Sequence, residues 1–313
     1  MSNVELVHQS HCRIGEAVIW SVAEQAIYWS DILGHKVYRY KPLLGEKGTT
    51  DCWPVKQNIT SIGFSKNDTL VGTLYDGFYA LDIINDSHTK ISAPNIDYTA
   101  IRFNDGAVDT HGQYWSGTMH TDDPMNNSLG ELYRFDEAGK SSLQDEDYHC
   151  TNGPCFTSDG SIMYHTDTLI RQKVYRCELD KVGNLISRST FIHFDKEGTY
   201  PDGMCLDKDE NLWVALWGGW GVNQYSPDGT LLQHIKLPVA QVTKCVFGGE
   251  NLDTLYITSA SEYLSDEDSA NQPLAGCLFS YKTNTQGKAE NLYLDSGQNL
   301  RHNSYNNSYT KRR

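Results

Sequence analysis

The amino-acid sequence predicts an all-β fold, and three observations lead to that prediction. Short runs rich in aromatic and β-branched residues recur along the 313-residue chain, each preceded by residues typical of turns. A second run of the same kind follows each of them after about ten to twenty residues. No stretch keeps apolar residues at helical spacing for more than about two turns, which disfavours a helical solenoid or alternating strands and helices. We therefore expect short antiparallel strands.

The spacing of the runs predicts six repeats. The first runs begin 42 to 49 residues apart, at Tyr28, Leu70, Tyr114, Met163, Leu212 and Leu255. A unit of about 45 residues with several short strands has the size of one propeller blade. The predicted fold is therefore a six-bladed β-propeller, whose closure leaves few strand edges exposed. We expect residues 1–313 to form this one domain, with residues 303–313 either a flexible tail or a strand that latches the ring.

Composition narrows the class of partner. Hydrophobic residues make up 39% of the chain and charged residues 21%, which indicates a globular protein. Forty acidic against 26 basic residues leave a formal charge of −14, so neither nucleic acid nor an anionic membrane is an expected partner. The eight cysteines form no C-x-x-C pair and mostly lie in apolar runs, and no signal-like or membrane-spanning segment is apparent. We expect reduced thiols and a cytoplasmic protein; the sequence predicts no oligomeric state.

An innermost strand is expected about ten residues before each first run, and polar residues stand at its equivalent position in every blade. In chain order these are Glu16, Thr60-Ser61, Asn104, Asn152, Asp202 and Thr243-Lys244. Because all inner strands run the same way around the central channel, these positions converge at one mouth. The alternative is that the Asn-Gly and Asp-Gly pairs are turn residues that every blade needs. Glu16 argues against it, since Glu is not a turn former.

Two carboxylates and two carboxamides in a narrow channel require charge compensation, because neighbouring acids raise one another's pKa. A divalent cation is the simplest compensation. The ligands are all oxygen, and three or four of them leave positions on the ion for water or substrate. The sequence therefore predicts a central metal site, without separating calcium from manganese, zinc or iron(II).

Other motifs are rejected on spacing. Asp207, Asp209 and Asn211 match the first ligands of an EF-hand loop, but Leu212 stands where a glycine is required, so we predict a blade turn. No G-x-S-x-G, H-E-x-x-H, P-loop or G-x-G-x-x-G motif is present, which removes support for serine hydrolase, zinc peptidase and nucleotide chemistry.

A family resemblance rests on motifs in order along the whole chain. They are Gly15-Glu16 followed by Trp20, Asn104-Asp105-Gly106, Asn152-Gly153-Pro154, Tyr200-Pro201-Asp202-Gly203 and Phe247-Gly248-Gly249. In these the chain resembles the family of senescence marker protein 30, gluconolactonase and luciferin-regenerating enzyme, which are six-bladed propellers. Segments such as Met119-His120 and Ala215-Leu216-Trp217-Gly218-Gly219 are most similar to bacterial lactonases acting on xylono-, arabino- or gluconolactones.

The resemblance implies one divalent metal ion held by Glu16, Asn152 and Asp202. It also implies that Asn104 lies beside the ion and that Arg102 contacts substrate hydroxyls. One departure concerns the acidic residue that animal members place shortly after the Gly-Thr-Met segment, where this chain has His120 and Thr121. We expect His120 to be a substrate contact at the rim. The simpler alternatives are that Arg102 pairs with a surface acid and that His120 and His165 are ordinary satisfied polar residues.

The leading hypothesis is hydrolysis of sugar-acid lactones, such as glucono-, xylono-, arabino- or galactonolactone, to the free aldonic acids. The metal is expected to act as a Lewis acid and Asp202 as the general base of this carboxylic ester hydrolase. There are two alternatives. One is a phosphotriester hydrolase, because related six-bladed propellers with a similar metal hydrolyse phosphorus esters. The other is a non-catalytic calcium-binding propeller.

Overall fold

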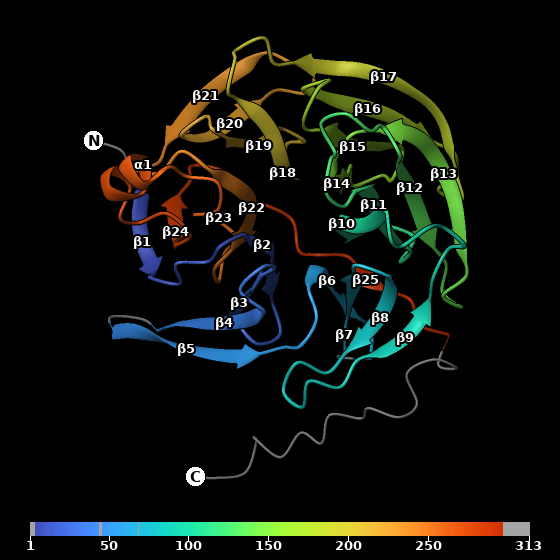
Figure 1. The fold of residues 1–313 in the computed structure, drawn as a ribbon, viewed down its shortest axis with the longest axis horizontal. Helices are drawn as coiled ribbons and strands as arrows, with labels where there is room; N and C mark the ends of the chain where they lie inside the picture. The colour runs from blue at the N-terminus through green and yellow to red at the C-terminus, as the bar shows by residue number, and fades with distance from the viewer. Residues whose placement is uncertain (1–3, 44–45, 68, 297–313) are drawn as a thin grey trace.

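The strands of the computed structural model form a ring of six sheets around a central channel (Figure 1). The structure describes residues 4–43, 46–67 and 69–296. Within these ranges each sheet has one strand beside the channel and further strands stacked outward from it. The predicted all-β, six-bladed propeller is confirmed.

Blades one to three are built from consecutive strands, ordered from the channel outward. Blade one contains β2 (Gly15–Ser21), β3 (Ala26–Asp31), β4 (Lys36–Leu43) and β5 (Glu46–Pro54). Blade two contains β6 (Ile59–Ser65), β7 (Leu70–Leu74), β8 (Gly77–Leu81) and β9 (Thr89–Ser92). Blade three contains β10 (Ile101–Val108), β11 (Tyr114–His120), β12 (Gly130–Phe135) and β13 (Ser141–Tyr148).

Blades four to six follow the same order, except at the closure of the ring. Blade four contains β14 (Thr151–Phe156), β15 (Ile162–Asp167), β16 (Lys173–Leu179) and β17 (Leu185–His193). Blade five contains β18 (Tyr200–Leu206), β19 (Leu212–Trp217), β20 (Gly221–Tyr225) and β21 (Leu231–Lys236). Blade six contains β22 (Val242–Gly248), β23 (Thr254–Ser259), β24 (Leu278–Lys282) and, outermost, β1 (Val4–His8). The short helix α1 (Asp266–Asn271) lies in the connection from β23 to β24.

The ring is closed by the N-terminal strand. Val4 of β1 pairs with Tyr281 of β24, so one sheet holds strands from both ends of the described chain. This pairing joins the two ends of the propeller into one ring and leaves each blade with only a short outer edge. The expectation that residues 303–313 form a tail or a latching strand falls outside the described residues.

The repeating runs correspond to the second and third strand of each blade. The aromatic and β-branched runs that begin at Tyr28 and Leu212, for example, lie in β3 and β19. Among the described residues, six apolar clusters fill the spaces between neighbouring sheets, one cluster for each adjacent pair of blades. The cluster between blades two and three is mainly aromatic, and the indoles of Trp115 and Trp213 are fully buried in two others. Close packing on both faces of each sheet gives the inner strands a rigid setting.

A buried aspartate organises the turn before the second strand in two blades. In blade five, Asp207 Oδ1 accepts the backbone N–H groups of Asp209 (3.0 Å) and Asn211 (2.9 Å), and Oδ2 accepts the indole N–H of Trp213 (3.1 Å). In blade three, Asp109 accepts the indole N–H of Trp115 at 2.8 Å in the same way. The segment that mimics an EF-hand is therefore a turn whose carboxylate serves backbone and indole donors.

Replacing Asp207 with alanine is expected to lower the free energy of unfolding by about 3 kcal/mol or more, because several buried donors lose their acceptor at once. The matched control is Asp228→Ala, in an exposed turn of the same blade where the carboxylate accepts Ser226 Oγ–H and Thr230 N–H. That change is expected to cost about 1 kcal/mol or less. Denaturant unfolding of both variants measures the difference, and equal costs would contradict the account.

Residues 286–296, which we call the far-mouth segment, cross one end of the channel. The backbone carbonyl of Gln286 accepts Lys208 N–H at 2.8 Å, and Leu294 N–H donates to Gly112 O at 2.8 Å. Between them, β25 (Leu292–Tyr293) pairs in parallel with β6. These contacts attach the segment to blades on both sides of the ring.

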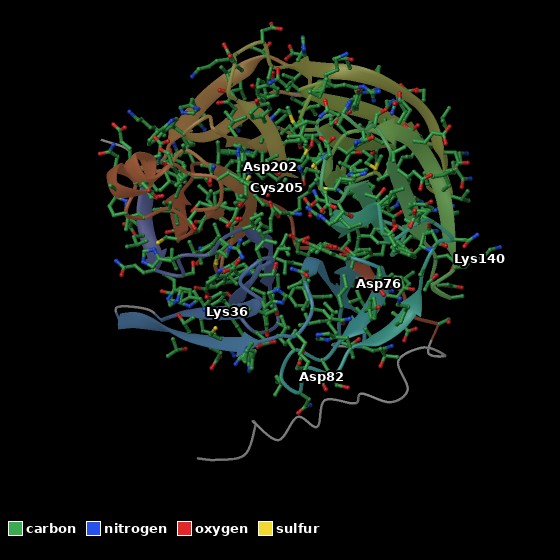
Figure 2. All side chains as sticks on the ribbon, in the orientation of Figure 1. Lys36, Asp76, Asp82, Lys140, Asp202 and Cys205 are labelled. Carbon is green, nitrogen blue, oxygen red and sulfur yellow. The ribbon has the colours of Figure 1, made fainter. Side chains whose placement is uncertain are left out.

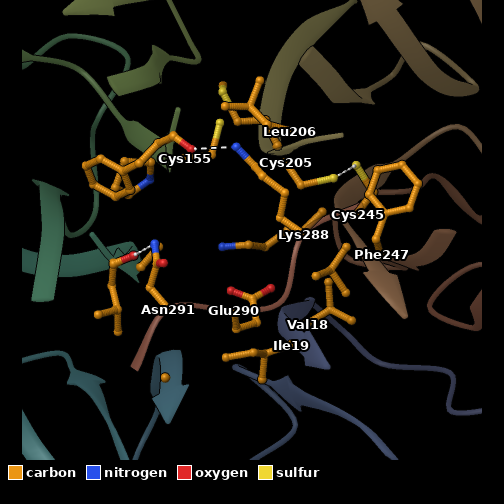
Figure 3. A pocket seen from close by; sticks show the side chains of 18 of the residues that line it. Val18, Ile19, Cys155, Cys205, Leu206, Cys245, Phe247, Lys288, Glu290 and Asn291 are labelled. Atoms are coloured by element: carbon orange, nitrogen blue, oxygen red, sulfur yellow. Dashed lines mark hydrogen bonds between the residues drawn. The ribbon is translucent and has the colours of Figure 1, made fainter. Parts of the chain in front are cut away.

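A cavity of about 90 Å³ lies beneath the far-mouth segment (Figure 3). The close-up shows Glu290 and Asn291 of this segment on one side, Cys205 and Cys245 of the inner strands on another, and the side chain of Lys288 extending up beside Cys205. Lys288 Nζ donates to Phe156 O at 3.0 Å and to Glu210 Oε2 at 2.9 Å. The inner-strand residues of this cavity come after the ring of polar residues in their strands, so the cavity belongs to the opposite end of the channel.

All eight cysteines are free thiols, as predicted. Cys205 Sγ and Cys245 Sγ are 3.8 Å apart, well beyond the bonded distance of about 2.05 Å. Among the described residues, no helix has the length and apolar character needed to cross a membrane.

Candidate metal centre and active site

Each innermost strand is interrupted by a β-bulge at the position where the sequence places a polar residue. The pairing register shifts after Glu16 in β2 and after Asn152 in β14. Equivalent shifts occur in β6, β10, β18 and β22. A bulge kinks the strand and re-aims the side chains beside it, and bulges are frequent next to active sites. The recurring bulge is the physical reason why these positions depart from the regular alternation of the sheet.

The two carboxamides meet directly. Asn104 Nδ2 donates to Asn152 Oδ1 at 2.7 Å and to the Thr151 carbonyl at 2.9 Å. Asn152 Nδ2 in turn donates to Thr168 Oγ1 at 2.7 Å. Residues from blades three and four, almost fifty positions apart, are thus held in one network. The network fixes Asn152 with its amide nitrogen toward its own blade and its oxygen toward Asn104.

Glu16 and Asp202 are buried acids that influence each other across the channel mouth. Each is 6% exposed, and no described side chain donates a hydrogen bond to either of them. Glu16 Oε2 accepts the Ala17 backbone N–H at 2.9 Å. Burial, reinforced by the charge of Asp105, raises the pKa of Glu16 to about 8. Burial and then the charge of Glu16 raise the pKa of Asp202 well above its ordinary value. Figure 2 shows Asp202 at the inner edge of its sheet.

A buried ion pair that the sequence reasoning missed lies in the same channel. Lys244 Nζ contacts Asp105 Oδ1, and the two residues are 7% and 2% exposed. Burial opposes the charge of Lys244, but the carboxylates of Asp105 and Glu16 outweigh it and hold the pKa of the ammonium above its usual value. Asp105 Oδ1 also accepts Gly106 N–H (2.7 Å), and Oδ2 accepts Gly153 N–H (3.1 Å). Lys244 directly follows Thr243 at the ring position of blade six, and the pair Thr243-Lys244 was the available signal in the sequence.

Arg102 lies beside the carboxamide network. Its Nη1 donates to Asn104 Oδ1 and to the Phe103 carbonyl, both at 3.0 Å. The guanidinium carbon is 4.8 Å from the centre of the Tyr75 ring, a cation–π contact that the sequence did not reveal. Among the described residues Arg102 forms no ion pair.

The two histidines singled out from the sequence have different surroundings. His120 is half-buried at the end of β11, where it pairs with Ile101 beside Arg102. Its Nδ1 accepts the backbone N–H of Asp123 at 2.9 Å, which places the ring hydrogen of the neutral form on Nε2. His165 is fully buried between Tyr148 and Tyr175, and burial lowers its pKa to about 4. His165 is therefore a packing residue of blade four.

The residues present suit a hard divalent cation. Glu16, Asp202 and Asn152 offer only oxygen, and the two acids are buried without a donating side chain, an arrangement that a cation would stabilise. Within the described ranges, no three His, Cys, Asp or Glu side chains are grouped as a metal site. The predicted set does not belong to that class, because it combines two carboxylates with one carboxamide.

Comparison with known proteins places the chain in a family. The model of the SMP-30/Gluconolactonase/LRE-like region matches residues 14–261, a stretch that contains every predicted site residue. The chain belongs to this family. It is 34% identical to a 6-deoxy-6-sulfogluconolactonase of Pseudomonas putida, over 90% of this chain and 94% of that protein. It is 32% identical to a pentonolactonase of Haloferax volcanii, over 92% and 97% of the two chains.

A solved structure shares the fold. The calcium-binding protein regucalcin from Agrobacterium tumefaciens superposes with a TM-score of 0.85 at 24% identity, covering 92% of this chain and 96% of that one. This likeness concerns the propeller architecture. Together with the family match, it confirms the resemblance inferred from the motifs.

Proposed function

We propose that this protein hydrolyses lactones of sugar acids to the free aldonic acids, with one divalent metal ion held by Glu16, Asn152 and Asp202. The observation that supports the proposal is that two buried carboxylates, one acting electrostatically on the other, and a hydrogen-bonded carboxamide pair occupy equivalent bulge positions of their inner strands, with Arg102 beside the carboxamides. Relatives named as lactonases of a sulfogluconolactone and of pentonolactones support the substrate class.

A divalent ion bound there supplies Lewis acidity toward the lactone carbonyl. Asp202 takes a proton from the attacking water through the carboxylate oxygen that does not hold the ion. The water oxygen bonds to the carbonyl carbon, the ring C–O bond breaks, and the proton passes to the departing ring oxygen. Glu16 and Asn152 serve as ligands.

Three polar residues bind the substrate's hydroxyl groups in this proposal. Arg102 offers a planar set of donors, and stacking on Tyr75 holds it in place. Asn104 both donates and accepts, although part of its capacity is used by Asn152 and Arg102. His120 offers Nε2–H from the end of β11.

A lactone panel tests the proposal. Purified protein is incubated with glucono-, xylono-, arabino- and galactonolactone, and ring opening is followed by proton release with a pH indicator. We expect at least one lactone to be opened far faster than in the buffer control, with the rate abolished by EDTA. A phosphotriester such as paraoxon is included. Faster turnover of the phosphotriester indicates the alternative hydrolase, and no turnover of any substrate indicates a binding protein.

A further inference from the structure

The residues that follow the ring positions form a second layer with an unusual composition. In chain order this layer contains Ala17, Ser61, Asp105, Gly153, Gly203 and Lys244. Four members are small, and the two long charged side chains come from blades three and six, which stand opposite each other in the ring (Figure 1). The pair between Asp105 and Lys244 therefore spans the channel directly beneath the polar ring. We call it the cross-channel pair.

The surroundings of Lys244 show that room is made for its side chain. A Cβ atom on Gly203 would lie 2.5 Å from Lys244 Cγ, so only glycine leaves space for the lysine stem beside Asp202. Asp105 is fixed from the other side by the backbone N–H of Gly153, directly after Asn152. Glu290 of the far-mouth segment also acts on the charge of Lys244 from below. The cross-channel pair thus touches the backbone next to two of the proposed ligands.

The charges of the side chains around the proposed metal centre indicate what the cross-channel pair does. Glu16, Asp202 and Asp105 are three acids that act electrostatically on one another, and Lys244 is the cation that acts on all three. Counted over the polar ring and the layer directly beneath it, without Glu290 of the far-mouth segment, the group with charged Lys244 carries an excess of two negative charges, the number that one divalent ion neutralises. Without Lys244 the excess would be three, which suits a trivalent ion better.

We propose that Lys244, through its pair with Asp105, is a positioning residue that sets the charge preference of the metal centre to divalent ions. This inference rests on the proposed metal centre. It assigns Lys244 no contact with substrate. The pair acts by lowering the negative charge beneath the ion and by holding the backbone that carries Asn152.

The test compares calcium with lanthanum, a trivalent ion of similar size and similar preference for oxygen. Metal-free protein is titrated calorimetrically with each ion, and the ratio of the two dissociation constants is compared across variants. Lys244→Met removes the charge while keeping most of the side-chain volume. We expect this ratio to change at least about tenfold in favour of lanthanum binding over calcium binding, which corresponds to about 1.4 kcal/mol. Lys288→Met is the matched control, because Lys288 lies at the far mouth and pairs with Glu210. Its ratio should equal that of the wild type.

Two further variants keep the inference testable if Lys244→Met folds poorly. The double variant Asp105→Asn with Lys244→Met has the wild-type charge excess, so its ratio should return toward the wild-type value. Asp105→Asn alone leaves Lys244 unopposed and should move the ratio toward calcium. A ratio that does not follow charge in this order overturns the role of Lys244 while leaving the metal centre intact. If the wild type binds neither ion, both the metal centre and this inference are wrong.

Discussion

Replacing Asp202 with asparagine is expected to lower kcat/KM for the best lactone by about 10²- to 10⁴-fold, the usual contribution of a general base. Asparagine keeps the size of the side chain and one ligand oxygen, but it cannot take a proton from water. The effect should therefore fall mainly on kcat. Steady-state kinetics with saturating metal ion measures it, and circular dichroism verifies that the fold is intact.

Two controls show whether Asp202 acts as the general base, only binds the metal ion, or only supports the fold. Asp195→Asn changes an aspartate whose side chain is 86% exposed, and it should leave the kinetics unchanged. Calorimetric titration of Asp202→Asn shows whether the ion still binds. If this variant binds the ion and keeps more than about a tenth of the wild-type kcat, Asp202 is a ligand and not the base.

Removing the metal ion is expected to abolish hydrolysis and to make stability depend strongly on pH. Without a cation, burial raises the pKa of Glu16 to about 8, against about 4.5 for the exposed group of the unfolded chain. The folded state then binds more protons than the unfolded state between these two values. The stability of metal-free protein should therefore fall as the pH rises from about 5 to about 8.

The ion takes over the role of the proton at the upper end of this range. The increase in Tm caused by the ion should thus be larger at pH 8 than at pH 5, as measured by differential scanning calorimetry. Glu290, whose pKa burial raises to about 7, also lowers stability as the pH rises, whether or not the ion is bound, and Glu290→Gln removes that effect. A Tm increase that is independent of pH would show that Glu16 and Asp202 do not share an ion. Restoring activity after chelation with calcium, manganese, zinc and iron(II) separately identifies the ion.

The blades could be predicted from the sequence because each repeats the same local pattern. Tyr28-Trp29 and Leu212-Trp213 mark strands that are buried on both faces, and such strands need aromatic or β-branched residues. The polar ring could be predicted for a related reason. Glu16 and Asp202 interrupt strands that are otherwise apolar, and a carboxylate at such a position requires an explanation beyond packing.

Other features depend on the closed ring and leave no local pattern. The pairing of Lys244 with Asp105 joins opposite blades, so it can be recognised only when the number of blades and their closure into a ring are known. The closing strand of blade six, Val4–His8, lies at the other end of the chain from its partner β24. The two-residue strand β25 is too short to show a period. Cation–π support of Arg102 by Tyr75 likewise comes from the ring, because the two residues belong to different blades.

The far-mouth segment affects how small molecules can enter and leave the channel. Gln286, Asn291 and Leu294 attach it to several blades, so one end of the channel is covered by chain. In the proposed reaction, a lactone arriving at Glu16 and Asp202 and an aldonate leaving them would then use the same opening. Each turnover would end with departure of the acid before the next ring could enter, and accumulated acid would compete directly with fresh substrate.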